Sequence, residues 1–198
     1  TLDRQELAFH IRRIDESSRL KAIDEALDEI EQRHREEDGV ESLFEPAGDD
    51  SVCGIIFANT KKNRRYPGVG CQEILDHLIS QDIGADVYHA DRGADRSRVQ
   101  QRYLDNEFTV MVATKAFGMG VNKRNVRYTI HSGLPWSIEA FYQEAGRAGR
   151  DDDPKRSWSD CYILYVPDAN AERTERLFAA STTIEEIQRL QDDLQGDL

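Results

Sequence analysis

Short apolar runs alternate with amphipathic stretches along most of this chain. Five of the runs are bounded by polar or glycine-containing segments, which is typical of buried strands in a parallel sheet. These runs occupy residues 52–58, 85–89, 110–114, 127–131 and 160–166. Apolar residues at helical spacing fill much of the sequence between them, as in residues 70–81. The alternation predicts an α/β fold with a mainly parallel sheet and helices on both faces.

The beginning of the chain predicts a strand of a different kind. Residues 6–14 alternate apolar and more polar positions, and the apolar set is Leu7, Phe9 and Ile11. A period of two residues is the pattern of a half-buried strand, and here it favours a sheet edge. His10 falls on the polar side of this strand, so we expect it to face solvent.

Helical periodicity follows this strand and returns at the end of the chain. Residues 16–37 predict an amphipathic helix, whose apolar stripe is Leu20, Ile23, Leu27 and Ile30. An acidic connection with glycine and proline covers residues 36–51. Near the end, Asp168 is expected to cap a helix that runs to about Ala180, and a last short helix is expected after it.

Charge is distributed unevenly along the chain. The net charge of −12 argues at first against a nucleic-acid partner. However, residues 1–50 carry −9 and residues 151–198 carry −7, whereas residues 51–150 carry +4. Because the local field steers a polyanion more than the total charge does, a nucleic-acid partner stays open.

Composition narrows the class of protein further. The 198 residues are 38% hydrophobic and 32% charged, as in a soluble domain with one sizeable core. No apolar run approaches the ~20 residues of a membrane span, so no membrane partner is expected. Three widely separated cysteines form neither a disulfide framework nor a zinc site, and no metal site is predicted in this chain. Free cysteines of this kind favour a reducing compartment, and we expect the protein to be cytoplasmic.

The candidate chemistry is concentrated between Val110 and Asp153. The strand at residues 110–114 runs into a loop containing Gly118 and Gly120, where missing Cβ atoms would let backbone approach a ligand. Most glycine-rich loops are merely turns, so this feature alone is weak evidence. It gains weight from the strand and the arginine-bearing helix that follow it.

That helix is predicted to begin after Ser137, a favourable N-cap residue. It carries Gln143, Arg147 and Arg150 if it continues through two glycines. Two guanidinium groups on one helical face suit a multiply charged oxyanion such as a polyphosphate. An arginine pair is more often a solvated surface, and the combination with the glycine loop is what favours a binding role.

Two runs within this stretch resemble motifs V and VI of superfamily 2 helicases, most closely those of the RecQ family. They read ATKAFGMGVNKRNVR and IHSGLPWSIEAFYQEAGRAGRD. Asn59-Thr60-Lys61 at the end of another strand is similar to motif IV of that family. Tyr88-His89-Ala90 is similar to a further motif, after which the family places an arginine on a helix, and Arg96 is the best match.

The resemblance implies the second RecA-like motor domain of a DNA helicase. This fold is a three-layer α/β sandwich, here with an N-terminal edge strand and helix and a short C-terminal helix. Residues 1–180 would form the domain, in which 1–51 supply the opening strand, acidic helix and linker and 52–180 the motif-bearing core. Residues 181–198 would be a helix or linker toward a further domain. The zinc subdomain and winged helix that often follow in the family are not visible.

The resemblance also implies roles at an ATP site shared with a first RecA-like domain outside this chain. Arg150 would be an arginine finger toward the γ-phosphate, with Arg147 assisting and Gln143 coupling the site. Gly118 and Gly120 would lie near the nucleotide. Asn122 stands where related helicases often carry an aspartate near the ribose. ATP and Mg²⁺ would be held mostly by the first domain, since this chain has no G-x-x-x-x-G-K-[ST] loop. The chain alone is therefore expected to hydrolyse no ATP.

A second set of residues is expected to contact the tracking strand of single-stranded or forked DNA. The resemblance assigns this contact to Asn59, Thr60, His89, Arg96 and Thr114, although His89 could equally be a satisfied strand-end histidine. Composition and position add the loop residues Lys61, Lys62, Arg64, Arg65 and Tyr66, which offer phosphate partners and a stacking face. A solvated loop is nearly as good an interpretation of this segment.

Two alternatives from other classes remain. The chain could be a non-catalytic interaction module with the same fold, although a scaffold has no need of paired arginines. It could be a dinucleotide-binding domain, but no G-x-G-x-x-G follows its first strands. Within the helicase interpretation, the sequence leaves RNA or DNA as the substrate open. Roles in DNA repair and recombination are expected from the family resemblance alone.

Overall fold

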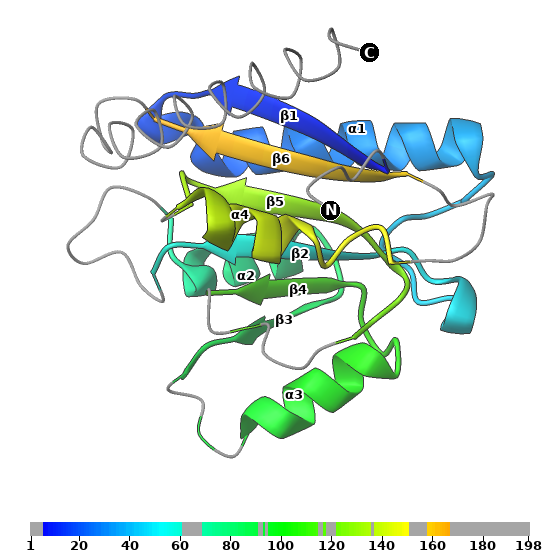
Figure 1. The fold of residues 1–198 in the computed structure, drawn as a ribbon. Coiled ribbons are helices and arrows are strands. Elements are labelled where there is room, and N and C mark those ends of the chain that lie inside the picture. Colours follow the sequence, from blue (N-terminus) through cyan, green and yellow to red (C-terminus); the bar gives the residue numbers. More distant parts are fainter. Residues whose placement is uncertain are drawn as a thin grey trace, which may run out of the picture.

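A single parallel sheet organises the molecule (Figure 1). The computed structural model describes residues 6–60, 69–90, 93, 95–114, 117, 122–135, 137–150 and 158–166. Its strands are β1 (Leu7–Arg13), β2 (Cys53–Ala58), β3 (Ala85–Tyr88), β4 (Val110–Ala113), β5 (Val126–Ser132) and β6 (Ser159–Tyr165). Their order across the sheet is β1-β6-β5-β2-β4-β3, and every neighbouring pair is parallel. The predicted strands are therefore confirmed, with bounds shifted by a residue or two.

Helices cover both faces of this sheet. On one face lie α1 (Arg19–Glu37) and α2 (Cys71–Ser80), and on the other lie α3 (Asp95–Leu104) and α4 (Ile138–Ala145) (Figure 1). Short 3-10 turns occupy Glu16–Ser18 and Gly48–Asp50. Two apolar clusters fill the spaces between the layers, one around Ile23, Leu27 and Leu78 and one around Tyr103, Phe117 and Ala145. The expected three-layer α/β sandwich is confirmed. The expected C-terminal helices lie outside the described residues.

The central strand β2 serves both layers. Cys53, Ile55 and Phe57 pack toward α3 and α4, whereas Ile56 and Ala58 pack toward α1 and α2. All six residues of β2 are buried. This burial explains why its sequence is a continuous apolar run without a polar alternation.

The edge strand β1 is less buried on its apolar face than predicted, although Leu7 is buried there as expected. Its position at the sheet edge, beside β6, is confirmed. However, Phe9 is 44% exposed and Ile11 is 68% exposed. His10 instead turns toward buried polar groups, where its Nε2 lies 2.7 Å from Asp160 Oδ1 and its ring stacks on Tyr162. The His10 side chain is 33% exposed, so it stays partly solvated, and β6 additionally offers it a buried carboxylate that a period of two residues cannot reveal.

Asp160 connects three elements on this side of the sheet. It is 1% exposed, and its Oδ1 also accepts a hydrogen bond from Arg33 Nη1 of α1 at 2.8 Å. The Arg33 guanidinium stacks over the Trp158 ring at 3.8 Å from the ring centroid. The buried carboxylate thus ties α1 and β1 to β6 through two partly exposed partners.

Gly54 in β2 allows the closest packing in the sheet. A Cβ atom at this position would lie 1.9 Å from two ring carbons of Tyr128, which is fully buried. We expect Gly54→Ala to lower the free energy of unfolding by about 3 kcal/mol or more, because neither strand can move away. Gly84→Ala is the matched control, since its Cβ would meet nothing nearer than 3.8 Å. Urea unfolding of both variants checks this, and equal midpoints would contradict it.

The Asp160 connection predicts a second effect on stability. Asp160→Asn removes the negative charge of the carboxylate to which both Arg33 and His10 are bonded. It should lower the free energy of unfolding by about 1–3 kcal/mol. Asp28→Asn, an exposed change on α1, should stay within ~0.5 kcal/mol of the parent. Thermal unfolding of the two variants compares them. An unchanged midpoint for Asp160→Asn would show that the carboxylate adds nothing to the docking of α1 and β1.

Candidate functional site

Four predicted residues meet at the carboxyl edge of the sheet. Asn59 and Thr60 follow β2, His89 follows β3, and Thr114 follows β4. All four are partly exposed. Backbone bonds fix the strand ends there, with Thr114 N donating to Tyr88 O at 3.2 Å and Cys71 N donating to Thr60 O at 2.9 Å. Neighbouring strands of a parallel sheet end at one edge, and such edges are where α/β proteins bind ligands.

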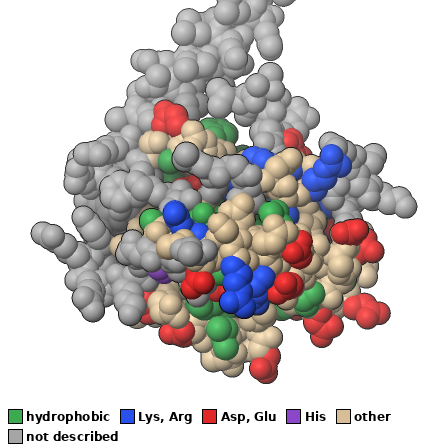
Figure 2. Space-filling view, turned by 90° about the horizontal axis from the view of Figure 1, so that it is seen from below, with side chains coloured by type: hydrophobic (Ala, Val, Ile, Leu, Met, Phe, Trp, Pro, Cys, Tyr) green, Lys and Arg blue, Asp and Glu red, His purple; other side chains and the backbone are tan. Residues whose placement is uncertain are grey.

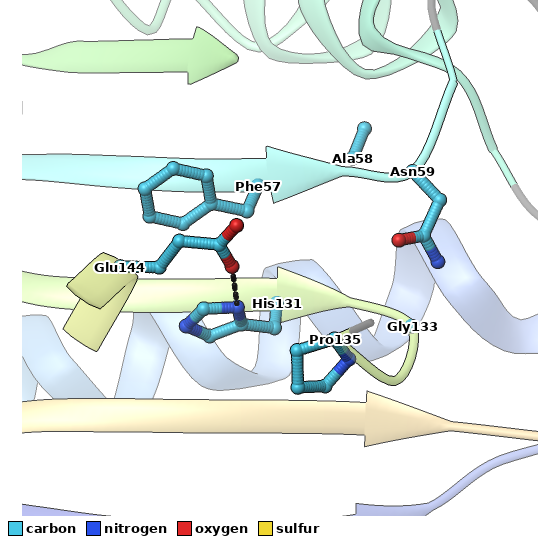
Figure 3. A pocket seen from close by; sticks show the side chains of 7 residues that line it. All are labelled: Phe57, Ala58, Asn59, His131, Gly133, Pro135 and Glu144. Carbon is cyan, nitrogen blue, oxygen red and sulfur yellow. Dashed lines mark ion pairs between the residues drawn. The ribbon is translucent and has the colours of Figure 1, made fainter. Parts of the chain in front are cut away.

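A small pocket opens at this edge between β2, β5 and α4 (Figure 3). Its lining residues are Phe57, Ala58, Asn59, His131, Gly133, Pro135 and Glu144. The His131 Nδ1 lies 3.2 Å from Glu144 Oε2, and the imidazole is sandwiched between the rings of Phe57 and Phe141. Gly133 has φ +137°, and a Cβ there would come within 2.4 Å of Asn59 Nδ2. The glycine therefore leaves room for the Asn59 amide.

The sequence did not point to His131, Gly133 or Glu144 as parts of a site. His131 belongs to a buried apolar strand, and Glu144 looks like any polar residue of an amphipathic helix. The one available signal was position, because His131 is near the carboxyl end of its strand. Only the three-dimensional packing of α4 on β5 brings these residues beside Asn59.

The arginines lie beyond the end of α4, not on it. Ser137 caps the helix as predicted, since its Oγ accepts a hydrogen bond from Ala140 N at 3.1 Å. The helix ends at Ala145, and Gly149 has φ +68°, a left-handed conformation that breaks helical geometry. The expectation that the helix continues through both glycines is wrong. Arg147 and Arg150 therefore belong to a turn, while Gln143 is exposed on the helix.

This turn lies at the opposite end of β5 from the carboxyl-edge residues. Gly149 N donates to Val126 O at 3.2 Å, and Val126 is the first residue of the strand. The strand has seven residues. At ~3.3 Å per residue, its two ends are separated by ~20 Å. The structure thus places the arginines and the carboxyl-edge residues at two separate sites, joined by α4 and β5.

The arginine site has only neutral oxygen partners among the described residues. Arg150 Nε donates to Gly146 O at 2.9 Å, and Arg150 Nη1 donates to Asn122 Oδ1 at 3.2 Å. The Arg147 Nε is buried and has no hydrogen-bond partner in the described part of the chain. Burial lowers the pKa of Arg147, and the positive charge of Arg150 lowers it further. Within the described ranges, no carboxylate forms an ion pair with either guanidinium.

The other predicted residues are exposed or lie outside the described part of the chain. Arg96 is exposed at the beginning of α3 and bonds Gly93 O at 3.3 Å. Asn122 is exposed next to Arg150. Seven predicted residues lie outside the described part of the chain, namely Gly118, Gly120, Lys61, Lys62, Arg64, Arg65 and Tyr66.

Charges on the side of α3 are mixed (Figure 2). Lys and Arg side chains alternate there with Asp and Glu, and no single basic patch dominates this view. Arg102, for example, bonds both Asp86 and Glu107 at 2.8 Å. Arginines on this side that are paired in this manner are already neutralised, so they are poor candidates for binding a polyanion.

The described residues offer no metal site, and their cysteines are buried. Within the described residues, no group of three His, Cys, Asp or Glu side chains could hold a metal ion. The three cysteines are free and buried, and burial raises the pKa of Cys53 to about 11 and of Cys71 to about 12. None of the described helices combines the length and the apolarity needed to cross a bilayer.

Comparison with known proteins gives one family. The family described as "Helicase conserved C-terminal domain" matches residues 40–152. ATP-dependent DNA helicase Q5 of Mus musculus is 39% identical over 119 residues, which cover 60% of this chain and 11% of the relative. ATP-dependent DNA helicase RecQ of Haemophilus influenzae is 43% identical over 115 residues, covering 58% and 17%. This chain thus spans less than a fifth of either relative.

A solved structure supports the fold. The structure of S. cerevisiae Dbp5 bound to RNA and ADP BeF3 superimposes with a TM-score of 0.58 at 16% sequence identity, covering 83% of this chain and 36% of that chain. The shared architecture is the RecA-like sandwich. The family match over residues 40–152, together with the RecQ relatives, shows that this chain belongs to the helicase conserved C-terminal domain family, as a RecQ-family helicase C-terminal domain of superfamily 2.

Proposed function

We propose that this chain is the C-terminal half of the motor of an ATP-dependent DNA helicase. In this role, Arg147 and Arg150 reach the phosphates of an ATP molecule held mainly by a first RecA-like domain. The carboxyl-edge residues contact the tracking single strand. The two sites lie at opposite ends of a seven-residue strand that is ~20 Å long, so a nucleotide and a nucleic acid can be bound together.

The arginine site carries this proposal. Two guanidinium groups lie close enough for the charge of one to lower the pKa of the other, and the Nε of Arg147 is already out of water. Desolvating a cation is unfavourable unless an anion or several hydrogen bonds compensate for it. Among the described residues, the hydrogen bonds at this site are those of Arg150 to a carbonyl and an amide oxygen, and Glu144 acts on Arg147 through its charge. A polyphosphate would complete the site with charge-assisted, bidentate hydrogen bonds.

The chemistry of phosphoryl transfer explains why arginines are useful here. Negative charge spreads over the transferring phosphoryl group, and a guanidinium fixed beside it stabilises that charge. The chain has no P-loop, so ATP and Mg²⁺ would be held by the other domain. Closure of the two domains would bring the arginines to the γ-phosphate, and reopening after hydrolysis would move the strand.

At the carboxyl edge, the available groups are mostly neutral. Asn59, Thr60 and Thr114 offer amide and hydroxyl groups, which suit the sugar-phosphate backbone and carry no sequence information. The relatives that this chain matches are named ATP-dependent DNA helicases, which favours DNA over RNA as the strand. A purely structural module is disfavoured, because the like-charged arginines would only destabilise it.

The arginine proposal predicts a specific kinetic defect. In the complete helicase, Arg150→Ala should lower kcat for DNA-stimulated ATP hydrolysis by about 10³-fold or more while KM for ATP changes little. The reason is that the finger acts on charge that develops in the transition state. Arg35→Ala, an exposed change on α1, is the matched control and should leave both constants unchanged. A raised KM with normal kcat would assign Arg150 to ground-state binding instead.

The nucleic-acid proposal predicts two different salt responses. Asn59→Ala should weaken binding of single-stranded DNA without changing its salt dependence, because a neutral amide releases no counterions.

Replacing Lys61, Lys62, Arg64 and Arg65 together by Ala should flatten the log–log slope by about 0.7 for each phosphate that the variant no longer binds. Fluorescence titrations at several salt concentrations measure both. A parent-like slope in the quadruple variant would mean that those four residues face water, and unaltered affinity in Asn59→Ala would remove Asn59 from the interface.

A further inference from the structure

A partly buried polar cluster lies next to the arginine site and is not used by the proposed function. We call it the Asn106 cluster, and it consists of Asn106, Lys123 and Asn125. The Lys123 Nζ donates to Asn106 Oδ1 at 2.5 Å, and Asn125 Nδ2 donates to the same oxygen at 2.9 Å. Lys123 is only 5% exposed. One amide oxygen therefore accepts hydrogen bonds from two residues of the turn that leads into β5.

Several features make this cluster rigid. Asn106 sits just after α3 with φ +57°, a left-handed conformation that few residues other than glycine adopt. Lys123 Nζ also lies 3.4 Å from Leu104 O and 5.0 Å from the centroid of the Tyr103 ring. Asn125 Nδ2 donates to Ser51 O at 2.8 Å, and Asn125 O accepts from Cys53 N at 2.9 Å. The turn is thereby fastened to α3 on one side and to β2 on the other.

The cluster holds the ammonium group of Lys123 out of water, in a position where an apolar side chain would lose no hydration of a charge. Burial lowers the pKa of Lys123, which reflects the free energy of holding its charge out of water. Polar groups buried in this way often specify one arrangement of the chain, whereas well-packed apolar residues give equal or greater stability. The arrangement that this cluster specifies is the path of residues 122–125.

That path ends at the arginine site. Asn122 is adjacent to Lys123 in the sequence, and its Oδ1 accepts the hydrogen bond from Arg150 Nη1 at 3.2 Å. At the other end of the turn, Val126 O accepts from Gly149 N at 3.2 Å. The segment held by the Asn106 cluster therefore binds both the backbone and the guanidinium of the arginine turn.

We propose that Asn122, held by the Asn106 cluster, is a positioning residue that orients the Arg150 guanidinium for ATP hydrolysis. Its amide contacts the finger rather than the ribose of the nucleotide. This inference rests on the proposed role of Arg150. Asn122 stands where related helicases often carry an aspartate. The proposed role agrees with the hydrogen bond that Asn122 accepts from Arg150. It also explains why a lysine and two asparagines are placed behind an exposed turn.

Geometry sets the expected size of the effect. A long arginine side chain samples many rotamers unless a hydrogen bond selects one, and a misplacement of ~1 Å in a catalytic group can slow a reaction by about 10²-fold. Losing Asn122 Oδ1 should leave Arg150 present but poorly oriented. The turnover should therefore fall by less than when Arg150 itself is removed, by about 10- to 100-fold.

The test is a set of double-mutant cycles in the complete helicase. Asn122→Ala and Lys123→Met are made alone and together with Arg150→Ala, and kcat and KM for ATP are measured with single-stranded DNA. Each single variant should lower kcat while KM stays within about twofold, as expected for a group acting only in the transition state. In the Arg150→Ala background, neither change should lower kcat further, because the residue through which it acts is gone.

Controls separate orientation from folding and from nucleotide binding. Gln101→Ala removes a comparable exposed amide on α3, which bonds Asp105 at 2.9 Å, and should leave kcat unchanged. Asn122 is exposed, so its variant is expected to keep the parent's thermal unfolding midpoint even if Lys123→Met does not. A higher KM with normal kcat in Asn122→Ala would place it at the nucleotide and overturn the inference. So would losses that multiply with that of Arg150→Ala. If Arg150→Ala itself keeps normal kcat, the proposed function fails first.

Discussion

The contact between Gly54 and Tyr128 is the constraint on which the rest of the sheet depends. The ring of Tyr128 occupies the space where any other residue at position 54 would place its Cβ. The carbonyl oxygen of Gly54 also accepts a hydrogen bond from Tyr103 OH of α3 at 3.0 Å. The pairing of β2 with β5 shifts register between Cys53 and Gly54. The central strand thus sets the position of α3 and the beginning of β5 together, and the arginine turn docks at that beginning.

The direction in which α4 runs determines where the two sites lie. The helix begins beside the carboxyl edge and runs back along the sheet (Figure 1), and the turn that follows it meets the first residue of β5 through Gly149. It is fixed on the way by the His131–Glu144 pair and by the edge-on contact of Phe141 with His131, whose other face stacks on Phe57. A short helix anchored at several points behaves as one rigid piece. The pocket beside Asn59 and the guanidinium of Arg150 are therefore connected by packed elements rather than by a flexible loop.

The parts of this arrangement that could be predicted are those that depend on local pattern. Buried strands such as β2 are recognisable as apolar runs, and the alternation of strands with helices determines the parallel sheet. Ser137 was recognisable as a helix cap because capping depends on nearby residues. The partner of His10 was not predictable, because it is a buried carboxylate 150 residues away in sequence. The end of α4 was also not predicted. A glycine can lie within a helix or end it, and the contacts of its backbone decide which of the two occurs. At Gly149 the backbone meets Val126, which sequence cannot show.

The arginine site shows why such departures from simple rules occur together. Local preference would continue the helix, pair each guanidinium with a carboxylate and fill the space behind the turn with apolar side chains. Instead the helix stops, the Arg150 guanidinium has neutral hydrogen-bond partners among the described residues, and the buried Lys123 lies against partly buried asparagines. Each of these features lowers the stability of the isolated chain, and chains tolerate such losses mainly where function requires them. The three departures lie within one continuous set of contacts from Asn106 to Arg150. These departures are therefore concentrated where we propose that an anion from outside the chain binds.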